Sequence, residues 1–423
     1  MSVFNETIPP GSGGKCMDQS ARVEVTPYRW VVLAVYMLIT ALSQIMWMTF
    51  APIARDAAAV YTAGNVDQID YLAMLAMFSW LPFAVPAAWC IDTYGLKRGA
   101  GIGVILIGVC GFMRIFAPNY TWLLVSMIGC AVAQPFVLNA FTKLAANWFP
   151  EKEEALASGL LTMSMFVGFT TVMFGTDFIM AHYRALGTVQ EGIRVILYAY
   201  GIPALVAMIL FIFLFKEKPE FPPNAYANEK KVSMTVGLKA LFGNRDFLIL
   251  LALFFIGLGA FNGILTEIDN IFKDRPLDIE STLAPGIVGG LMVIGGMFGA
   301  VILSALSDRY RTRKIFLIAA VSAAIPMTIL IQTLSSIVAL GACGFVFGFF
   351  LVPALPVGLT FAVEKTHPVP EATSNGILML SGQISGIPIV IFFNMKMITV
   401  LFCIGLVLAF FLTEGKGEKA KGQ

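Results

Sequence analysis

Residues 92–98 have the sequence Asp-Thr-Tyr-Gly-Leu-Lys-Arg, and residues 308–314 have the sequence Asp-Arg-Tyr-Arg-Thr-Arg-Lys. Both segments begin with an aspartate, continue into basic residues and lie between long apolar runs. A second pair follows at the next equivalent loops, with Glu-Ala-Leu-Ala-Ser-Gly-Leu at 154–160 and Glu-Ala-Thr-Ser-Asn-Gly-Ile at 371–377. The two pairs are offset by 216 and 217 residues. Two matches at nearly one offset indicate a parallel repeat of two halves.

The segments between these loops are long, apolar and free of charge. Of the 423 residues, 58% are hydrophobic and 13% are charged, compared with about 25% charged residues in soluble domains. A membrane-spanning helix needs about 20 apolar residues, and the chain has eleven charge-free windows suited to such helices. The window 315–363 suffices for two helices and breaks at residues 333–336. We therefore predict an all-α membrane protein of twelve transmembrane helices in two pseudo-symmetric six-helix halves.

The charged residues divide the chain into five parts and indicate its orientation. We expect a cytoplasmic tail at residues 1–29, a six-helix bundle at 30–215, a cytoplasmic linker at 216–244, a second bundle at 245–413 and a cytoplasmic tail at 414–423. Of the 28 lysines and arginines, 21 fall on the side of the two termini. Because cytoplasmic loops are enriched in these residues, we predict that both termini are cytoplasmic, and we expect the plasma membrane as the location.

Composition argues against several classes of function. The net charge of +2 supplies no basic field for nucleic acid. The six cysteines show no CxxC motif and no metal-ligand spacing, so we expect neither a metal site nor a cofactor. The chain has no Gly-rich phosphate loop and no nucleophile–base motif, which argues against an ATP-driven pump and against an enzyme. The expected partners are a small-molecule solute and the lipid bilayer, and we expect a monomer.

The loops that begin with Asp92 and Asp308 resemble the signature loops of the major facilitator superfamily. The resemblance covers the whole chain and implies a six-plus-six helix fold. The first copy departs from the pattern at Thr93, where an arginine is usual, and the second has Arg311 in place of a glycine. A carboxylate at the end of one helix can accept hydrogen bonds from the N-terminal amides of a neighbouring helix, so we expect these loops to latch the cytoplasmic gate. The predicted gating residues are Asp92, Lys97, Asp308, Arg309 and Glu371.

Four further stretches resemble the feline leukaemia virus subgroup C receptor-related family, whose members are linked to haem and to choline or ethanolamine transport. They are Tyr28-Arg29-Trp30 followed by Trp47, the segment from Trp80 to Trp89, Ala133-Gln134 followed by Asn147-Trp148-Phe149, and the segment 361–376 followed by Gln383. The resemblance implies that Trp47 is an aromatic wall of the substrate site, that Gln134 is a polar contact, and that Gln383 matches a family glutamine. Choline-binding members carry a tyrosine where this chain has Asn262, so one wall of an aromatic cage is missing here.

Physical chemistry supports a substrate-binding role for the same side chains. The face of a tryptophan attracts an ammonium ion by about 0.5–2 kcal/mol, which makes Trp47, with Trp80 as a second aromatic candidate, suited to an amine. Uncharged polar side chains within membrane spans need polar partners, so Gln134, Asn262 and Gln383 face other helices or a wet cavity. Hydrogen bonding between helices is the alternative role for each amide, and core packing is the alternative for Trp47.

Two carboxylates lie toward the outer end of the seventh span. Glu267 and Asp269 are two residues apart, so on a regular helix they point about 200° apart and only one of them faces the cavity. Asp269 shares a face with Asn262, whereas a break at Gly263 would turn Glu267 inward. Either carboxylate is a candidate for attracting a cation or taking up a proton, and a solvated position at the membrane interface is the alternative. We expect uniport.

Other residues are predicted to shape the helices. Arg114 is expected to extend toward the outer interface, with Asp177 as a candidate partner. The glycine pairs 286/290 and 295/299 allow two helices to approach closely and predict a packing surface. Helix kinks are expected at Pro82, Pro86, Pro353, Pro356 and Pro388.

Together these features predict a secondary transporter that moves a small organic solute, an amine or zwitterion similar to choline or ethanolamine, by alternating access. The cavity would lie between spans 1, 4, 7 and 11. An organic-anion transporter is the alternative, disfavoured because no arginine or lysine lies deep in these spans. A haem transporter is disfavoured because His182 and His367 lie in loops on opposite sides. A non-transporting membrane receptor is a third alternative.

Overall fold

The computed structural model describes residues 26–219, 240–273, 275–278, 282–366, 369 and 371–414. Most of the predicted tails and of the predicted linker lies outside the described residues, and so do the side chains of Asp308 and Glu371. Every regular element in the described part is helical. The all-α class predicted from the sequence is therefore confirmed.

Six spans form each half of the molecule. The first half comprises α1 (Tyr28–Met48), η1 (Ala51–Ile53), α2 (Ala54–Tyr61), α3 (Val66–Tyr94), α4 (Leu96–Met113), η2 (Arg114–Phe116), α5 (Tyr120–Leu138), α6 (Phe141–Trp148), α7 (Glu151–Ala185) and α8 (Val189–Leu214). The second half comprises α10 (Arg245–Thr266), α11 (Ile268–Ile271), α12 (Ala284–Tyr310), α13 (Lys314–Thr333), α14 (Ile337–Leu351), α15 (Ala354–Thr366), α16 (Glu371–Ile391) and α17 (Met395–Phe410). Eleven of the described spans are long and apolar enough to cross a membrane, and the shorter apolar α17 is the twelfth.

The first and fourth spans of each half are broken at matching places. In the first span, α1 ends at Met48 and the chain passes through η1 into α2, and in the seventh, α10 ends at Thr266 before α11. In the fourth span α5 ends at Leu138 before α6, and in the tenth α14 ends at Leu351 before α15. These breaks recur at nearly the spacing of the sequence repeats. Discontinuous helices at membrane depth are tolerated where the backbone lines a cavity or packs against protein, as at transport sites.

Each of the repeated loops contains a residue with a positive φ. Gly95 separates α3 from α4 with a φ of 93°, and Arg311 occupies the matching place before α13 with a φ of 51°. Glycine adopts this left-handed region without a steric penalty, whereas a residue with a Cβ is strained there by roughly 1–2 kcal/mol. The second loop therefore has a positive φ at Arg311 at the cost of strain that a glycine would avoid.

The two halves meet along two helix pairs, α3 with α16 and α7 with α12. Small residues make the second pair close: a Cβ added to Gly286 would meet Asp177 of α7, and one added to Gly290 would meet the ring of Phe174. The glycines at 295 and 299 instead lie against the backbone of α14. The predicted glycine packing surface is thus present, and it faces α7 at one end of α12 and α14 farther along.

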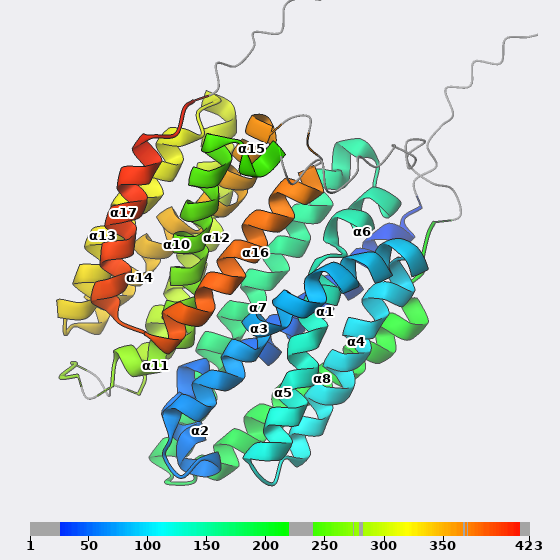
Figure 1. Ribbon diagram of the computed structural model, residues 1–423. Helices are drawn as coiled ribbons and strands as arrows, with labels where there is room; N and C mark the ends of the chain where they lie inside the picture. The colour runs from blue at the N-terminus through cyan, green and yellow to red at the C-terminus, as the bar shows by residue number, and fades with distance from the viewer. Residues whose placement is uncertain are drawn as a thin grey trace, which may run out of the picture.

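The two ends of the molecule differ in the short helices that they carry. In Figure 1, α6 and α15 lie at one end, and α2 and α11 lie at the opposite end. We call the end with α6 and α15, where the described chain begins and finishes, the near end. We call the end with α2 and α11 the far end.

Candidate functional site

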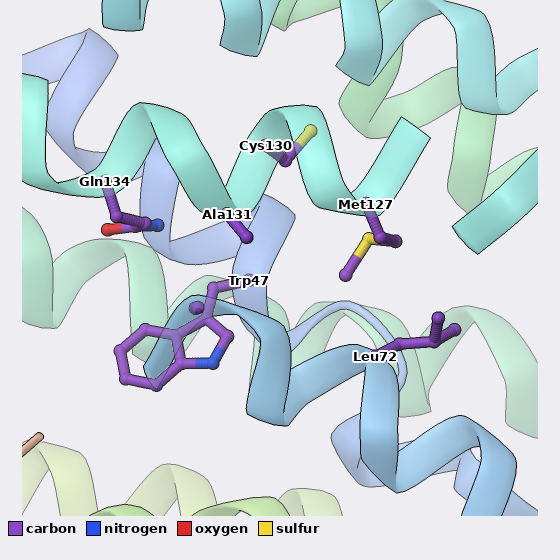
Figure 2. Close-up of a pocket in the computed structure, with 7 residues that line it drawn as sticks. Trp47, Leu72, Met127, Cys130, Ala131 and Gln134 are labelled. Atoms are coloured by element: carbon purple, nitrogen blue, oxygen red, sulfur yellow. The ribbon is translucent and has the colours of Figure 1, made fainter. Parts of the chain in front are cut away.

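Trp47 lies in the last turn of α1 and forms one wall of a narrow void (Figure 2). Its indole Nε1 donates a hydrogen bond to the carbonyl oxygen of Ala73 on α3 at 2.8 Å, and its ring meets that of Phe169 on α7 edge-on, with centroids 5.7 Å apart. The indole N–H is thus satisfied within the protein, so any contact that Trp47 makes with a ligand is apolar or cation–π. The void is lined by Trp47, Leu72, Ala76, Met127, Cys130, Ala131 and Gln134.

Gln134 of α5 borders the same void, with its amide directed toward α1 (Figure 2). Its Nε2 donates to the carbonyl oxygen of Ser43 at 2.8 Å, and its Oε1 accepts from Nε2 of Gln44 at 3.2 Å. The side chain of Gln44 is fully buried, and its Oε1 has no hydrogen-bond partner among the described residues. Because a buried acceptor without a partner is costly, Gln44 offers a hydrogen-bond acceptor beside Trp47 and Gln134.

The other predicted binding residues lie elsewhere in the fold. Asn262 of α10 donates from Nδ2 to Oε1 of Gln383 on α16 at 3.4 Å, so these two buried amides bond to each other within the second half. Trp80 of α3 is buried and lies four residues beyond Ala76, on the same helix face. The structure therefore joins Trp47 with Gln134 and Asn262 with Gln383, as two separate groups.

A larger groove lies between the halves, where α7 faces α12. Its volume is about 450 Å³, and its lining is apolar except for Thr170 and Thr171. Thr171 donates to the carbonyl oxygen of Val167 in its own helix, and the Thr170 hydroxyl lies 4.0 Å from the sulfur of Met297. Such a lining suits lipid tails better than a polar solute, so we base the candidate site on Trp47, Gln134 and Gln44.

The far end is closed by an ion pair between the halves. Arg55, in the first turn of α2, donates from Nε and Nη2 to Oδ1 of Asp269 at 2.8 and 2.6 Å, and its backbone N–H donates to Oδ2 at 2.8 Å. Asp269 belongs to α11 and is 2% exposed. An arginine held by both oxygens of a buried carboxylate is a strong, directional contact. The broken first helix of one half is thereby bonded to that of the other.

A second contact at the far end crosses between the halves beside the first. Nδ2 of Asn270 on α11 donates to Oδ2 of Asp70 on α3 at 3.0 Å and to Oε2 of Glu267 at 2.7 Å. Both carboxylates are 6% exposed. Glu267 follows the last residue of α10, and burial raises the pKa of its carboxyl to about 7.

The helix geometry assumed for Glu267 and Asp269, and the alternative of a solvated interfacial position, are not what the structure shows. The expectation assumed a regular helix through both residues or a break at Gly263, but the helix breaks at Glu267, where φ is −90° and ψ is 12°. In a regular helix each side chain is rotated by about 100° from the one before it, and this rule does not apply across the break. Both carboxylates are therefore buried against the first half, and neither is a solvated interfacial group.

The predicted pairing of Arg114 with Asp177 is also wrong. Asp177 accepts from Nη1 of Arg184 at 2.8 Å, and Arg184 also binds Asp56 at 2.6 Å and the carbonyl oxygen of Thr282 at 3.1 Å. The spacing of seven residues places Arg184 on the same face of α7 as Asp177. This network adds a third link between the halves at the far end.

Arg114 is fully buried instead of extending to the interface. Its guanidinium donates from Nη1 to the carbonyl oxygen of Met46 at 3.1 Å and from Nη2 to Oγ1 of Thr49 at 3.3 Å, and it also contacts the sulfurs of Met46 and Met127. These acceptors lie where α1 ends, and the C-terminus of a helix favours a positive charge. Arg114 therefore caps the break of the first span next to Trp47.

The near end contains the predicted gating residues. Nζ of Lys143 lies 3.4 Å from Oδ1 of Asp92, Nζ of Lys97 donates to the carbonyl oxygen of Ile212 at 3.1 Å, and Arg309 is exposed. The contacts of Asp92 with Lys143 and of Lys97 with Ile212 both lie within the first half. The side chains of the remaining two predicted gating residues are outside the described part of the chain.

The N-terminal amides that Asp92 and Asp308 were expected to bind are capped by other carboxylates. Glu217, after α8, accepts from the backbone N–H groups of Leu96 and Lys97 at 2.6 and 2.5 Å. Glu414, after α17, accepts in the same way from the N–H groups of Arg313 and Lys314 at 2.6 and 3.4 Å. In each half, the segment after the sixth span thus caps the third span at its positive end.

Sequence reasoning missed several residues of these sites. They are Gln44 as the partner of Gln134, Arg55, Asp70, Asn270 and Arg184 at the far end, and Glu217 and Glu414 at the near end. A usable signal was present for Gln44, a polar residue inside an apolar span one helical turn from Trp47. Among the described residues, no group of three or more His, Cys, Asp or Glu is arranged to hold a metal ion.

Comparison with known proteins extends over nearly the whole chain. The sequence profile described as Major Facilitator Superfamily matches residues 36–390. Solute carrier family 49 member A3 of Xenopus tropicalis is 30% identical over 410 residues, which cover 93% of this chain and 82% of that protein. The choline/ethanolamine transporter FLVCR2 of Homo sapiens is 28% identical over 381 residues, which cover 86% of this chain and 71% of that protein.

Solved structures share the fold at low sequence identity. The crystal structure of a D-xylose–proton symporter matches with a TM-score of 0.73 at 14% identity, covering 92% of this chain and 99% of the other. A bacterial homolog of the human lysosomal transporter Spinster, in an inward-facing and unoccupied conformation, matches with a TM-score of 0.66 at 17% identity, covering 92% and 95%. At these identities the likeness concerns the fold alone.

Proposed function

The chain belongs to the major facilitator superfamily, as its signature loops predict, and we propose that it carries a small organic amine or zwitterion, similar to choline or ethanolamine, across the membrane by alternating access. It is a multi-pass integral membrane protein of a transporter family. Two of its relatives, from Homo sapiens and Felis catus, are by their names choline/ethanolamine transporters.

One observation carries the choice of an amine: Trp47 and Gln134 line a single buried void, and Gln44 is hydrogen-bonded to Gln134. The tryptophan offers a π face to an ammonium group, and the free Oε1 of Gln44 offers an acceptor to an N–H or O–H of the solute. An ethanolamine-like molecule carries both groups. The void is narrow in this state, so the solute binds there after the surrounding helices separate.

Alternating access is supported by the contacts between the halves. Arg55–Asp269, Asp70–Asn270 and Arg184–Thr282 all join the two halves at the far end. A rocking motion of the halves would break these contacts together and open the far end of the molecule. We place the far end outside the cell and the near end, with both termini, in the cytoplasm of a plasma membrane, and we regard the protein as a monomeric uniporter.

The predicted gating role of the near-end loops belongs to the same proposal. In the outward-open state, Asp92, Lys97, Asp308, Arg309 and Glu371 would approach one another as the near end closes. The bonds of Asp92 and Lys97 within the first half would then hold their side chains in place for contact with the second half.

An organic anion is the weaker candidate, although a cation does lie deep among the spans. Arg114 is buried, contrary to the expectation from sequence, and lies close to Met127 of the void. Its terminal nitrogens, however, already bind the end of α1 through Met46 and Thr49. Because these donors are used to cap a helix, Arg114 is better explained as a structural cation than as an anion-binding group.

The test is uptake by purified protein in liposomes. Radiolabelled choline and ethanolamine should accumulate to equilibrium in an exchangeable manner, while benzoate and protoporphyrin should not. A thermal-shift screen of the same compounds should show stabilisation by the amines alone, because a ligand stabilises the state to which it binds. Stabilisation by the carboxylate or the porphyrin, without uptake of either amine, would replace the amine with the alternative substrate class.

A further inference from the structure

At the far end, two buried carboxylates from opposite halves accept hydrogen bonds from one amide nitrogen. Asp70 belongs to α3 and Glu267 follows α10, and each has an oxygen within 3.0 Å of Nδ2 of Asn270. The two oxygens are therefore near neighbours. Both side chains are 6% exposed, so water screens their charges poorly.

Within the described part of the chain, the charged side chains around this pair do not neutralise it. The charged side chains acting on Asp70 are Glu267, Asp269 and Asp67, all of them acidic, and Asp67 also acts on Glu267. Arg55 is the cation on the adjoining α2, and it is bound to Asp269 through Nε, Nη2 and its backbone N–H. The adjacent pair of Arg55 and Asp269 is thus balanced in charge, whereas Asp70 and Glu267 carry two negative charges when both are ionised.

Two like charges held close together in a poorly solvated site do not both ionise at neutral pH. We propose that Asp70 and Glu267 share one proton while the far end is closed, and that this proton makes closure of the far end sensitive to the pH of the solution on that side. Asn270 donates one amide hydrogen to each carboxylate. The proton neutralises one of the two charges and lets the halves meet.

The direction of the effect follows from linkage. When the halves separate, Asp70 moves away from Glu267 and both face water, so each returns to an ordinary carboxyl pKa of about 4. Because repulsion between the two carboxylates keeps a proton on the pair, the closed state binds more protons than the open state over a range of pH above about 4. The free-energy preference for the closed state is therefore largest at acidic pH and falls as the pH rises through this range. Above this range it no longer changes with pH.

The location of Asp70 and Glu267 also determines which solution supplies and receives the shared proton. This step rests on the proposed function, because it takes the far end to be the outer end. The pair is uncovered when the far end opens, so it takes its proton from the outer solution and returns it to the same solution. External pH then sets the position of the conformational equilibrium, while no net proton crosses the membrane. The protein remains a uniporter with a pH-sensitive outer gate.

The experiment measures the distance between spin labels at the far end by pulsed electron resonance, without any solute. Labels at A59C on α2 and S335C after α13 report on the two halves, since both positions are exposed. The background lacks the native cysteines that react with the label. In the wild-type sequence, the population with the long distance should rise at least about threefold from about pH 5 to about pH 8.

Removing either charge should abolish the response. In D70N and in E267Q one carboxylate remains, no proton needs to be shared, and the short distance should dominate at both pH values. The matched control is E191Q, which removes an exposed carboxylate at the start of α8 and should respond as the wild type does. The two variants alter opposite halves, so a folding defect in one leaves the other as a test.

Three results would overturn the proposal. The wild type could lack any pH response, D70N and E267Q could both respond as fully as the wild type, or uptake of the solute could acidify a pH dye enclosed in the liposomes. The last result would mean that the proton crosses the membrane with the solute. Failure of choline and ethanolamine uptake would contradict the proposed function alone, since the distance measurement needs no solute.

Discussion

Gln44 of α1 and Asn262 of α10 occupy matching positions in the two halves, each four residues before the end of its helix. Gln44 bonds to Gln134 on α5, whereas Asn262 bonds to Gln383 on α16. The backbones repeat, with the same break after the same turn, but the side chains pair with different helices. The repeat has therefore kept its hinge geometry while its polar chemistry has diverged.

The side chains of the two halves differ more strongly about one helical turn farther along α1 and α10. Trp47 in the first half is matched by Leu265 in the second, and both are buried. A solute that bound between the halves would then meet an aromatic wall on one side and aliphatic and amide groups on the other. Such an arrangement suits a solute whose two ends differ, with its ammonium group on the side of Trp47.

The largest effect is expected from removing the aromatic wall. W47A should weaken choline or ethanolamine binding at least about tenfold, through loss of the cation–π contact and of packing, and W47F should weaken it only by a few-fold. L265A, at the matching position, should lower the melting temperature while leaving the binding constant within about twofold. Isothermal titration and a melting curve measure the two effects. Equal binding losses in W47A and L265A would show that both residues act through packing alone.

Gln134 tests the polar side of the first half. Q134A removes the partner of Gln44, so ethanolamine, which carries a hydroxyl group, should lose affinity by about 3- to 10-fold, while tetramethylammonium should lose less. Competition against radiolabelled choline in liposomes measures both solutes. Q383A is the control in the second half, and it should not distinguish them. If both solutes lose affinity equally in Q134A, then Gln134 positions helices and does not contact the solute.

A substitution at Asn262 tests whether the second half can be given an aromatic wall like that of the first half. N262Y should build an aromatic wall in the second half and raise the affinity for quaternary amines by a few-fold, because a second ring adds a cation–π contact. Its effect on a primary amine should be smaller, and the ratio of the two binding constants is the measurement. A loss of affinity with an unchanged melting temperature would place Asn262 at the site with its amide, and not an aromatic ring, as the favourable group.

The smallest effect on affinity is expected at the near end. D308N removes a predicted gate charge, so it should favour the inward-open state and slow transport while the binding constant stays within about a few-fold. D92N, at the matching place in the first half, should behave similarly. The rate at which a maleimide reaches a cysteine placed in the inner part of the cavity measures the shift. An unchanged rate in both variants would remove the gate role from this pair of loops.

Several features of the fold were predictable because they depend on local pattern. The end of α13 at Thr333 and the start of α14 at Ile337 follow the polar break in an apolar run. The recurrence of the loops at Asp92 and Asp308 predicted the two halves. Glycines likewise indicated close packing, since a residue without a side chain lets two helices approach closely.

The partners of the charged residues were not predictable in the same way. The expectation for Arg114 and Asp177 used their depth in the membrane, but a short turn carries Arg114 under the end of α1, and Arg184 reaches Asp177 from about two turns away on its own helix. Similarly, regular helix geometry gave the wrong outcome for Glu267, because the backbone leaves the helix at that residue. For Arg114 and Glu267, the error came from a local deviation of the backbone.

The sequence by itself determined the membrane-spanning helices, the repeat of two halves and the superfamily, because hydrophobic length and repeated loop motifs are properties of contiguous residues. It also singled out Trp47 and Gln134 through motif and chemistry. Only the tertiary structure decided that these two residues line one void, that Gln44 bonds to Gln134, and that Asp70 shares an amide with Glu267 across the halves. The physical reason is that such contacts depend on where four broken helices end, and those breaks are set by packing between segments far apart in the chain.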